Sequence, residues 1–229
     1  MLFEDLALNS VILELRYDEG HLYWDTCGEM ILDIQRISPE WRWDGVSTEL
    51  AKLKNLRRNM ELMFNYSYIR LIQNEVDNLN QFKESVEKIT PRIVEKFKIE
   101  KFNRIGNRYQ YVLPLKNPEQ GKKIVRDSTL IEVSEEKLAL FGKDSTKTSF
   151  VLHIENKNLH YRVELISIER IAISRNIKVN ERFNPKYGLR IDVDIAIINE
   201  IKSSDFNYSD FIQANNKFLE YNLVKLIQK

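Results

Sequence analysis

The residues with the clearest chemical potential lie in one strand-like run, Phe102-Asn103-Arg104-Ile105-Gly106-Asn107-Arg108-Tyr109. Arg104 and Arg108 are four residues apart, so in a regular β-strand they share one face at a separation of about 13 Å. Glycine inside a strand, here Gly106, indicates a bulge or a close approach of another group to the backbone. Two guanidinium groups beside exposed backbone N–H groups can bind a phosphate or a carboxylate.

We therefore predict a binding site at Arg104, Gly106, Arg108 and Tyr109. The alternative is that both arginines pair with acidic residues on neighbouring strands and that Gly106 only relieves crowding. Replacing Arg108 with alanine separates the two. A binding residue can be removed without changing the melting temperature, whereas a large fall in melting temperature identifies a structural ion pair.

The same residues carry a resemblance to a known family. The segment from Arg104 to Tyr109 resembles the R-x-G-x-R-Y motif of a sporadically distributed family of uncharacterised bacterial proteins. The run 189–194 resembles the D-x-D strand of that family, and the last helix, with Phe218, corresponds to its C-terminal amphipathic helix. The family has no established activity. The resemblance implies an accessory of a bacterial mobile or defence gene cluster.

Asp192 and Asp194 form the second chemical candidate, because residues two apart on a strand project from one face. Paired carboxylates can hold Mg²⁺ for phosphoryl chemistry, as in a metal-dependent nuclease. The alternative is an inter-strand salt-bridge face that also includes Arg190. A metal site is therefore a weak prediction, and we expect no cofactor.

Other candidates are less specific. His153 and His160 flank a turn and face each other only if the loop is residues 156–157. The single cysteine, Cys27, lies in a predicted helix and is expected to be a packing residue. We find no phosphate-loop, dinucleotide-binding, zinc-protease or serine-hydrolase motif, so the sequence favours a protein without catalytic activity.

Nucleic acid is a further possible partner, although it is not favoured. A basic stretch follows Trp41 and Trp43 and could contact nucleic acid by charge and stacking; it consists of Lys52, Lys54, Arg57 and Arg58. A second basic cluster lies at 122–126. The 35 basic and 34 acidic residues nearly cancel, however, which disfavours a strongly basic nucleic-acid clamp. The sequence also has no secretory signal and no long apolar run, so we expect a cytoplasmic protein without a membrane span.

The elements that must position these residues follow from hydrophobic periodicity. Alternating patterns predict strands at 11–17, 60–66, 68–74, 102–115, 150–154, 161–165 and 189–197, and Ile171 and Ile173 continue the pattern. Helical spacing predicts helices at 22–37, from Asn78 to Phe97, from Pro118 and at 209–227. Residues 127–148 fit no element, and their polar tail at 142–148 is expected to be mobile.

Hairpins dominate, without regular strand–helix alternation. The pattern therefore predicts an α+β fold in which long amphipathic helices pack on antiparallel sheet. Both halves carry a hairpin, a further strand and a long helix, which suggests two similar lobes at 1–126 and 127–229, or one continuous domain. The resulting hypothesis is a non-catalytic protein that binds a protein partner. A small-ligand module is the alternative, beside the nuclease, and self-association would cover exposed strand edges.

Overall fold

The computed structural model describes residues 3–128, 149–170 and 180–227. The predicted α+β class is confirmed: within these ranges four α-helices accompany a nine-stranded antiparallel sheet and a two-stranded one. None of the described helices is long and apolar enough to cross a membrane. The predicted continuation at Ile171 and Ile173 and the polar tail at 142–148 lie outside the described residues.

The chain runs through two similar series of elements. The first is β1 (Ala7–Arg16), α1 (Leu22–Ile37), β2 (Arg42–Val46), β3 (Ala51–Asn55), β4 (Met60–Phe64), β5 (Tyr68–Asn74) and α2 (Leu79–Lys96). The second is β7 (Arg104–Leu115), α3 (Pro118–Ser128), β8 (Ser149–Asn156), β9 (Leu159–Glu169), β10 (Tyr187–Ile197) and α5 (Tyr208–Ile227). The short strands β6 (Lys101–Phe102) and β11 (Ile201–Lys202) form the second sheet.

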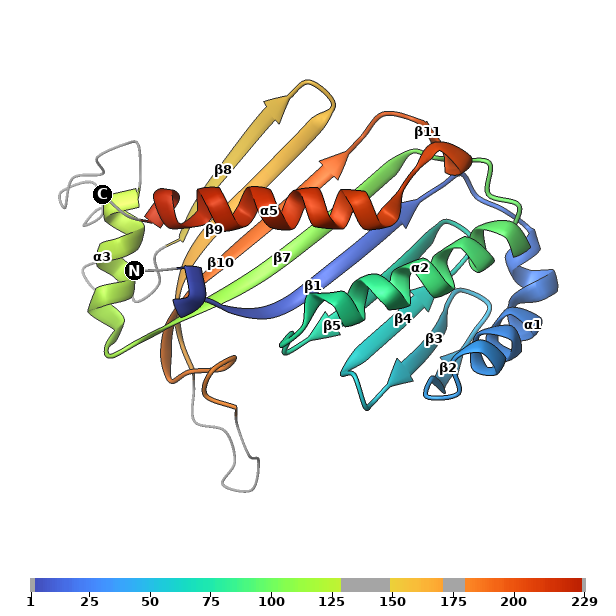
Figure 1. Cartoon of the computed structure of the whole chain (residues 1–229), viewed down its shortest axis with the longest axis horizontal. Helices are drawn as coiled ribbons and strands as arrows, with labels where there is room; N and C mark the ends of the chain where they lie inside the picture. Colours follow the sequence, from blue (N-terminus) through green and yellow to red (C-terminus); the bar gives the residue numbers. More distant parts are fainter. Residues whose placement is uncertain (1–2, 129–148, 171–179, 228–229) are drawn as a thin grey trace.

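The large sheet places the first strand of each series at its centre. Its order is β2-β3-β4-β5-β1-β7-β10-β9-β8, so β1 pairs with β7, and the last strand of each series, β5 or β10, lies on the outer side of that pair (Figure 1). The sheet is continuous from one series to the other. The predicted division at residue 126 falls within the last turn of α3, and it stays a prediction.

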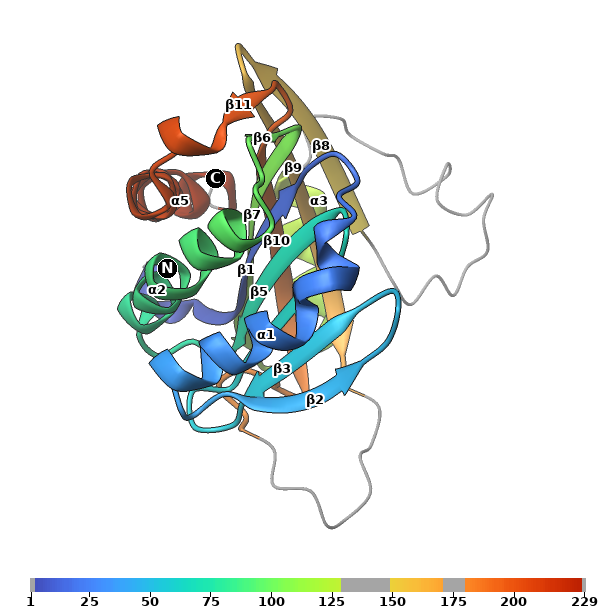
Figure 2. The same cartoon turned by 90° about the vertical axis from the view of Figure 1, so that its right-hand side faces the viewer.

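The four helices cover one face of this sheet (Figures 1 and 2). Alternation along the strands supplies the apolar side: Leu13 and Leu15 of β1 and Val193 of β10 are almost completely buried, whereas Arg16 and Asp194 point to the opposite face. Helix α5 lies over the second half of the sheet through one buried stripe, composed of Ile212, Leu219, Leu223 and Ile227. The other face of the central strands carries mainly charged and polar side chains, together with Ile12 and Ile72.

The sequence further predicts that Asn78 caps its helix, that Pro91 kinks or divides this helix, and that residues 41–45 form a turn. Asn78 does cap α2, since its side chain accepts a hydrogen bond from the backbone N–H of Asn80. Pro91 does not divide this helix, which continues from Leu79 to Lys96. The turn-like reading of 41–45 is wrong, because Arg42–Val46 forms the edge strand β2, which pairs with β3 across an irregularity between Trp43 and Gly45.

Candidate site on the open face of the sheet

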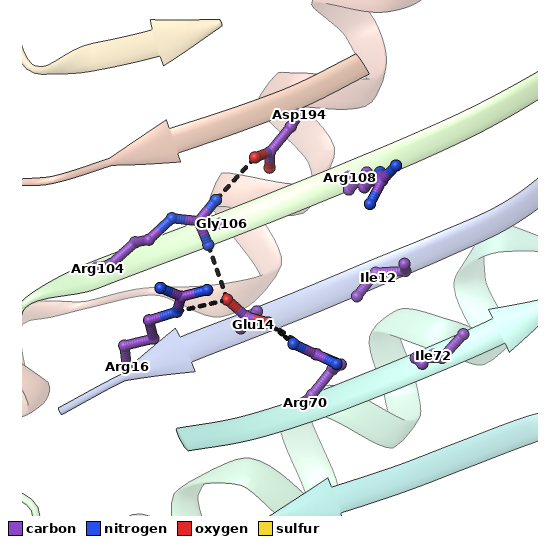
Figure 3. A pocket seen from close by; sticks show the side chains of 9 residues that line it. All are labelled: Ile12, Glu14, Arg16, Arg70, Ile72, Arg104, Gly106, Arg108 and Asp194. Carbon is purple, nitrogen blue, oxygen red and sulfur yellow. Dashed lines mark hydrogen bonds and ion pairs between the residues drawn. The ribbon is translucent and has the colours of Figure 1, made fainter. Parts of the chain in front are cut away.

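The centre of the open face is a grid of side chains from four adjacent strands (Figure 3). Strand β7 contributes Arg104, Gly106 and Arg108 at alternate positions. In the register of the sheet, Gly106 lies opposite Glu14 of β1, which in turn lies opposite Arg70 of β5. The regular alternation of the strands therefore brings residues from both halves of the sequence onto one surface.

Gly106 allows the Arg104 side chain to lie across β7. A Cβ atom at position 106 would be only 2.8 Å from Cζ and Nη2 of Arg104. Strand β7 keeps its regular register with β1 and β10 through this position, so the glycine makes room for a side chain and does not mark a bulge. Arg104 uses this space to bridge two strands: Nη1 donates to Glu14 at 3.1 Å and Nη2 to Asp194 at 2.7 Å.

Glu14 accepts hydrogen bonds from three arginines. Nε of Arg16 and Nε of Arg70 each donate at 2.7 Å, and Arg104 adds its own hydrogen bond. Burial opposes ionisation of this carboxyl, but the hydrogen bonds and charges of Arg70 and Arg16 outweigh it and lower the pKa of Glu14. Its side chain is only 11% exposed, so the charge at the centre of the grid is shielded from water and held by guanidinium groups.

Asp192 is the most deeply buried charge of the open face, with 1% of its side chain exposed. Arg108 holds it with both Nε, at 2.7 Å, and Nη2, and Gln110 donates to it at 2.9 Å. The hydrogen bond to Asp192 is the main cause that raises the pKa of Arg108. Arg108 therefore stays charged and fixed against β10.

The arginines of β7 reach diagonally to the aspartates of β10. Asp194 is the register partner of Arg108, yet it accepts its hydrogen bond from Arg104. Arg108 instead reaches Asp192, the register partner of Gln110. Both predicted metal-binding carboxylates are thus already ion-paired, and the described residues contain no cluster of three or more metal-ligating side chains. This arrangement matches the salt-bridge alternative for Asp192 and Asp194, except that their partners are Arg108 and Arg104 and not Arg190.

These side chains enclose a half-open cavity of about 270 Å³. Arginines form most of its charged wall, while Ile12 and Ile72 lie side by side in register on β1 and β5. The complete lining is Ile12, Glu14, Arg16, Arg70, Ile72, Arg104, Gly106, Arg108 and Asp194. The arrangement has no nucleophile with an adjacent general base, and it presents fixed hydrogen-bond donors beside a small apolar surface.

Of the four residues predicted to bind, the structure brings together Arg104, Gly106 and Arg108. It does not include Tyr109, which points to the helical face, is completely buried, and donates from its hydroxyl to the carbonyl of Ile212 at 3.0 Å. Sequence reasoning did not assign Glu14, Arg16 and Arg70 to the site. The alternation in 11–17 placed Glu14 and Arg16 on one polar face, and their long-range partners were the missing information.

The less specific candidates do not form a site. His153 and His160 are not opposite each other, because the loop consists of residues 157–158 and His153 pairs in register with Arg162. Cys27 is buried as expected, and burial raises the pKa of its thiol.

The proposed nucleic-acid stretch is largely neutralised. Lys52 and Lys54 both form ion pairs with Asp44, and Arg58 pairs with Glu84. Of the two tryptophans that could stack on bases, Trp41 is 1% exposed, whereas Trp43 is 64% exposed. Most of the basic charge of this stretch is therefore already paired within the protein.

Comparison with known proteins adds no assignment. The sequence matches no known family model, and no curated protein is significantly similar to it. The resemblance carried by the R-x-G-x-R-Y segment stays a prediction.

Proposed function

We propose that this chain is a non-catalytic binding protein that receives a protein partner on the open face of its sheet. The observation that carries the proposal is the cavity at the centre of that face, where arginines are held in place by the buried carboxylates of Glu14 and Asp192 and by Asp194. Ion pairs that fix a guanidinium reduce the side-chain entropy lost on binding, so such a surface is organised before the partner arrives. Arginine is also enriched among the residues that dominate protein interfaces.

The position of the cavity supports the same function. The helices cover one side of the sheet, whereas the cavity opens on the other side, where the side chain of Arg16 is 55% exposed. A half-open surface suits a macromolecular partner, because sites for whole small molecules enclose most of their ligand. Following the family resemblance, the proposed setting is a bacterial mobile or defence gene cluster.

Native mass spectrometry of the protein, purified gently from its own host, tests this proposal. We expect a complex with a second protein in stoichiometric amount. Arg16→Glu, on the open face, should abolish the complex, while Arg92→Glu, at an exposed position of α2 in the helical layer, should preserve it. A bare monomer, a homo-oligomer, or equal sensitivity of both variants would contradict a partner on this face.

A second candidate function is a small-ligand module, favoured by a separate cavity of about 370 Å³ between α5 and strands β8–β10. Its lining is mainly apolar and includes Leu152, Val163, Phe218 and Leu223. This volume falls within the usual range of small-molecule sites, about 300–1,000 Å³. A thermal-shift screen against metabolites and acyl compounds tests the alternative, and Leu223→Lys should abolish any stabilisation found.

A further inference from the structure

The arginine cavity has the features of a receptor for one particular chemical group. We infer that it binds the carboxylate of an acidic side chain in a peptide segment of the partner. This inference rests on the proposed function and specifies its ligand.

The charge balance of the cavity favours an anion. Its wall contains four arginines and two carboxylates, Glu14 and Asp194, and a third carboxylate, Asp192, holds Arg108 from outside the lining. One positive charge is therefore in excess. The excess is concentrated around Glu14, a single carboxylate that accepts hydrogen bonds from three guanidinium groups.

The guanidinium groups also retain donors for a ligand. Arg16 donates to Glu14 through Nε alone, while Arg70 and Arg108 each use Nε and Nη2. Within the described parts of the chain, Nη1 of Arg70 and of Arg108, and both terminal nitrogens of Arg16, make no hydrogen bond. The side chain of Arg70 is 34% exposed, that of Arg108 41% and that of Arg16 55%. An incoming oxyanion can therefore reach them from solvent.

The apolar part of the wall distinguishes a carboxylate from an inorganic anion. Ile12 lies in register between Ile72 on one side and Arg108 on the other, and both isoleucines are only partly buried. The methylene groups of a glutamate side chain can pack on these isoleucines while its carboxylate meets the guanidinium groups. A phosphate has no carbon to place there.

The size of the cavity indicates a side chain in preference to a complete metabolite. Its volume of about 270 Å³ lies just below the usual range for sites that enclose whole small ligands. One acidic side chain fits such a volume, and the open face of the sheet around it is available to the rest of the segment. The strands also supply a rigid frame for the arginines, because Arg70, Arg104 and Arg108 are tied to neighbouring strands by ion pairs. Arg16 is held by Glu14 of its own strand.

The test uses the full chain and three probes. N-acetyl-glutamate α-amide carries the side-chain carboxylate, N-acetyl-glutamine α-amide is its uncharged counterpart, and inorganic phosphate is the carbon-free anion. Titrations are followed through the arginine Nε–Hε resonances by NMR. We expect saturable shifts at Arg70 and Arg108 with the glutamate probe, weaker binding of phosphate, and none with the glutamine probe.

Variants show whether the binding occurs in the cavity. Arg16→Gln should weaken binding of the glutamate probe about tenfold, the effect of one charge-assisted hydrogen bond. Ile72→Ala should weaken binding of the glutamate probe more than it weakens binding of phosphate. Arg162→Gln is the matched control, since Arg162 is paired with Glu164 at 2.6 Å on β9 and does not line the cavity.

Each contrary result has a definite meaning. Phosphate binding as tight as, or tighter than, the glutamate probe would assign the cavity to a phosphoryl group and overturn the carboxylate. Equal binding of the glutamine probe, or no shift with any probe, would overturn an anion site altogether. The proposed function would survive these results if native mass spectrometry still showed a partner lost in Arg16→Glu, so the two failures are distinguishable.

Discussion

The guanidinium of Arg104 lies over Gly106, in the space that a larger side chain at position 106 would fill. A Cβ there would approach Cζ of Arg104 to 2.8 Å, and the arginine uses this position to reach Glu14 on one side and Asp194 on the other. The backbone at Gly106 pairs normally with both neighbouring strands. The need for glycine therefore comes from the ion-pair network and not from the conformation of the strand.

Gly106→Ala should consequently destabilise the protein by displacing Arg104. We expect a loss of about 1–3 kcal/mol in the free energy of unfolding, measured by urea denaturation. In an Arg104→Ala background the same substitution should cost much less, because no guanidinium then occupies the space. The two single variants and the double variant form a cycle that measures the coupling directly.

Gly28 provides the control for this prediction. It lies inside α1, and a Cβ built on it meets no atom within 4 Å. Gly28→Ala should stabilise the protein by about 0.5–1 kcal/mol, the usual gain in helix propensity. An equal cost of Gly106→Ala with and without Arg104 would show that the strand itself requires glycine.

Arg108→Ala should lower the melting temperature strongly. The substitution leaves Asp192, with 1% of its side chain exposed, without its ion-pair partner. Removing one member of a buried pair costs about 3 kcal/mol or more, because the remaining charge stays buried. Arg108→Ala therefore cannot test binding alone, because it also lowers stability. Arg16, whose side chain is 55% exposed, is the better position for a variant that tests binding.

The double variant Arg108→Ala/Asp192→Asn separates charge burial from other causes. Its neutral amide can still accept the hydrogen bond from Gln110, so most of the lost stability should return. A double variant as unstable as Arg108→Ala would show that packing of the arginine side chain, and not the buried charge, is the main contribution.

The sequence was most informative where periodicity is local. The helix over Leu22–Ile37 and the strands of the β4–β5 hairpin follow directly from spacing, and so does the common polar face of Asp192 and Asp194. Arg104, Gly106 and Arg108 could be selected as a unit for the same reason.

What the sequence left open depends on pairing over long distances. Glu14 and Arg104 are 90 residues apart, and only the central position of β1 beside β7 brings them together. Tyr109 shows the opposite case: it is adjacent to Arg108 in the motif, but alternation turns it to the other face of the sheet. Motif membership therefore does not imply membership of the site.

Stability should fall in acid partly through Glu14. Folding lowers the pKa of this carboxyl below the ordinary value of 4.5, so the folded state releases the proton more readily than the unfolded chain. The stabilisation by ionised Glu14 is therefore fully present above the pKa of this group in the unfolded chain. It is lost as the pH falls through the lower pKa of the folded state. Glu14→Gln should flatten this part of the pH profile of unfolding free energy.

The control for the pH profile is Glu87→Gln, an exposed carboxyl on α2. Its profile should remain parallel to that of the unmodified protein. If the Glu14→Gln profile also remained parallel, while its stability fell at every pH, the arginines would be contributing through packing and not through an ionised Glu14.

Tyr109→Phe should lower the stability of the protein without changing binding at the cavity. The Tyr109 hydroxyl donates to the carbonyl of Ile212 at 3.0 Å and thereby links β7 to α5 on the helical face. Its loss should reduce the free energy of unfolding by about 1 kcal/mol, the usual value for one hydrogen bond. Binding of the glutamate probe should not change, because the cavity lies on the other face of the same strand. A variant that keeps its stability but loses the probe would instead place Tyr109 in the binding machinery, together with Arg104 and Arg108.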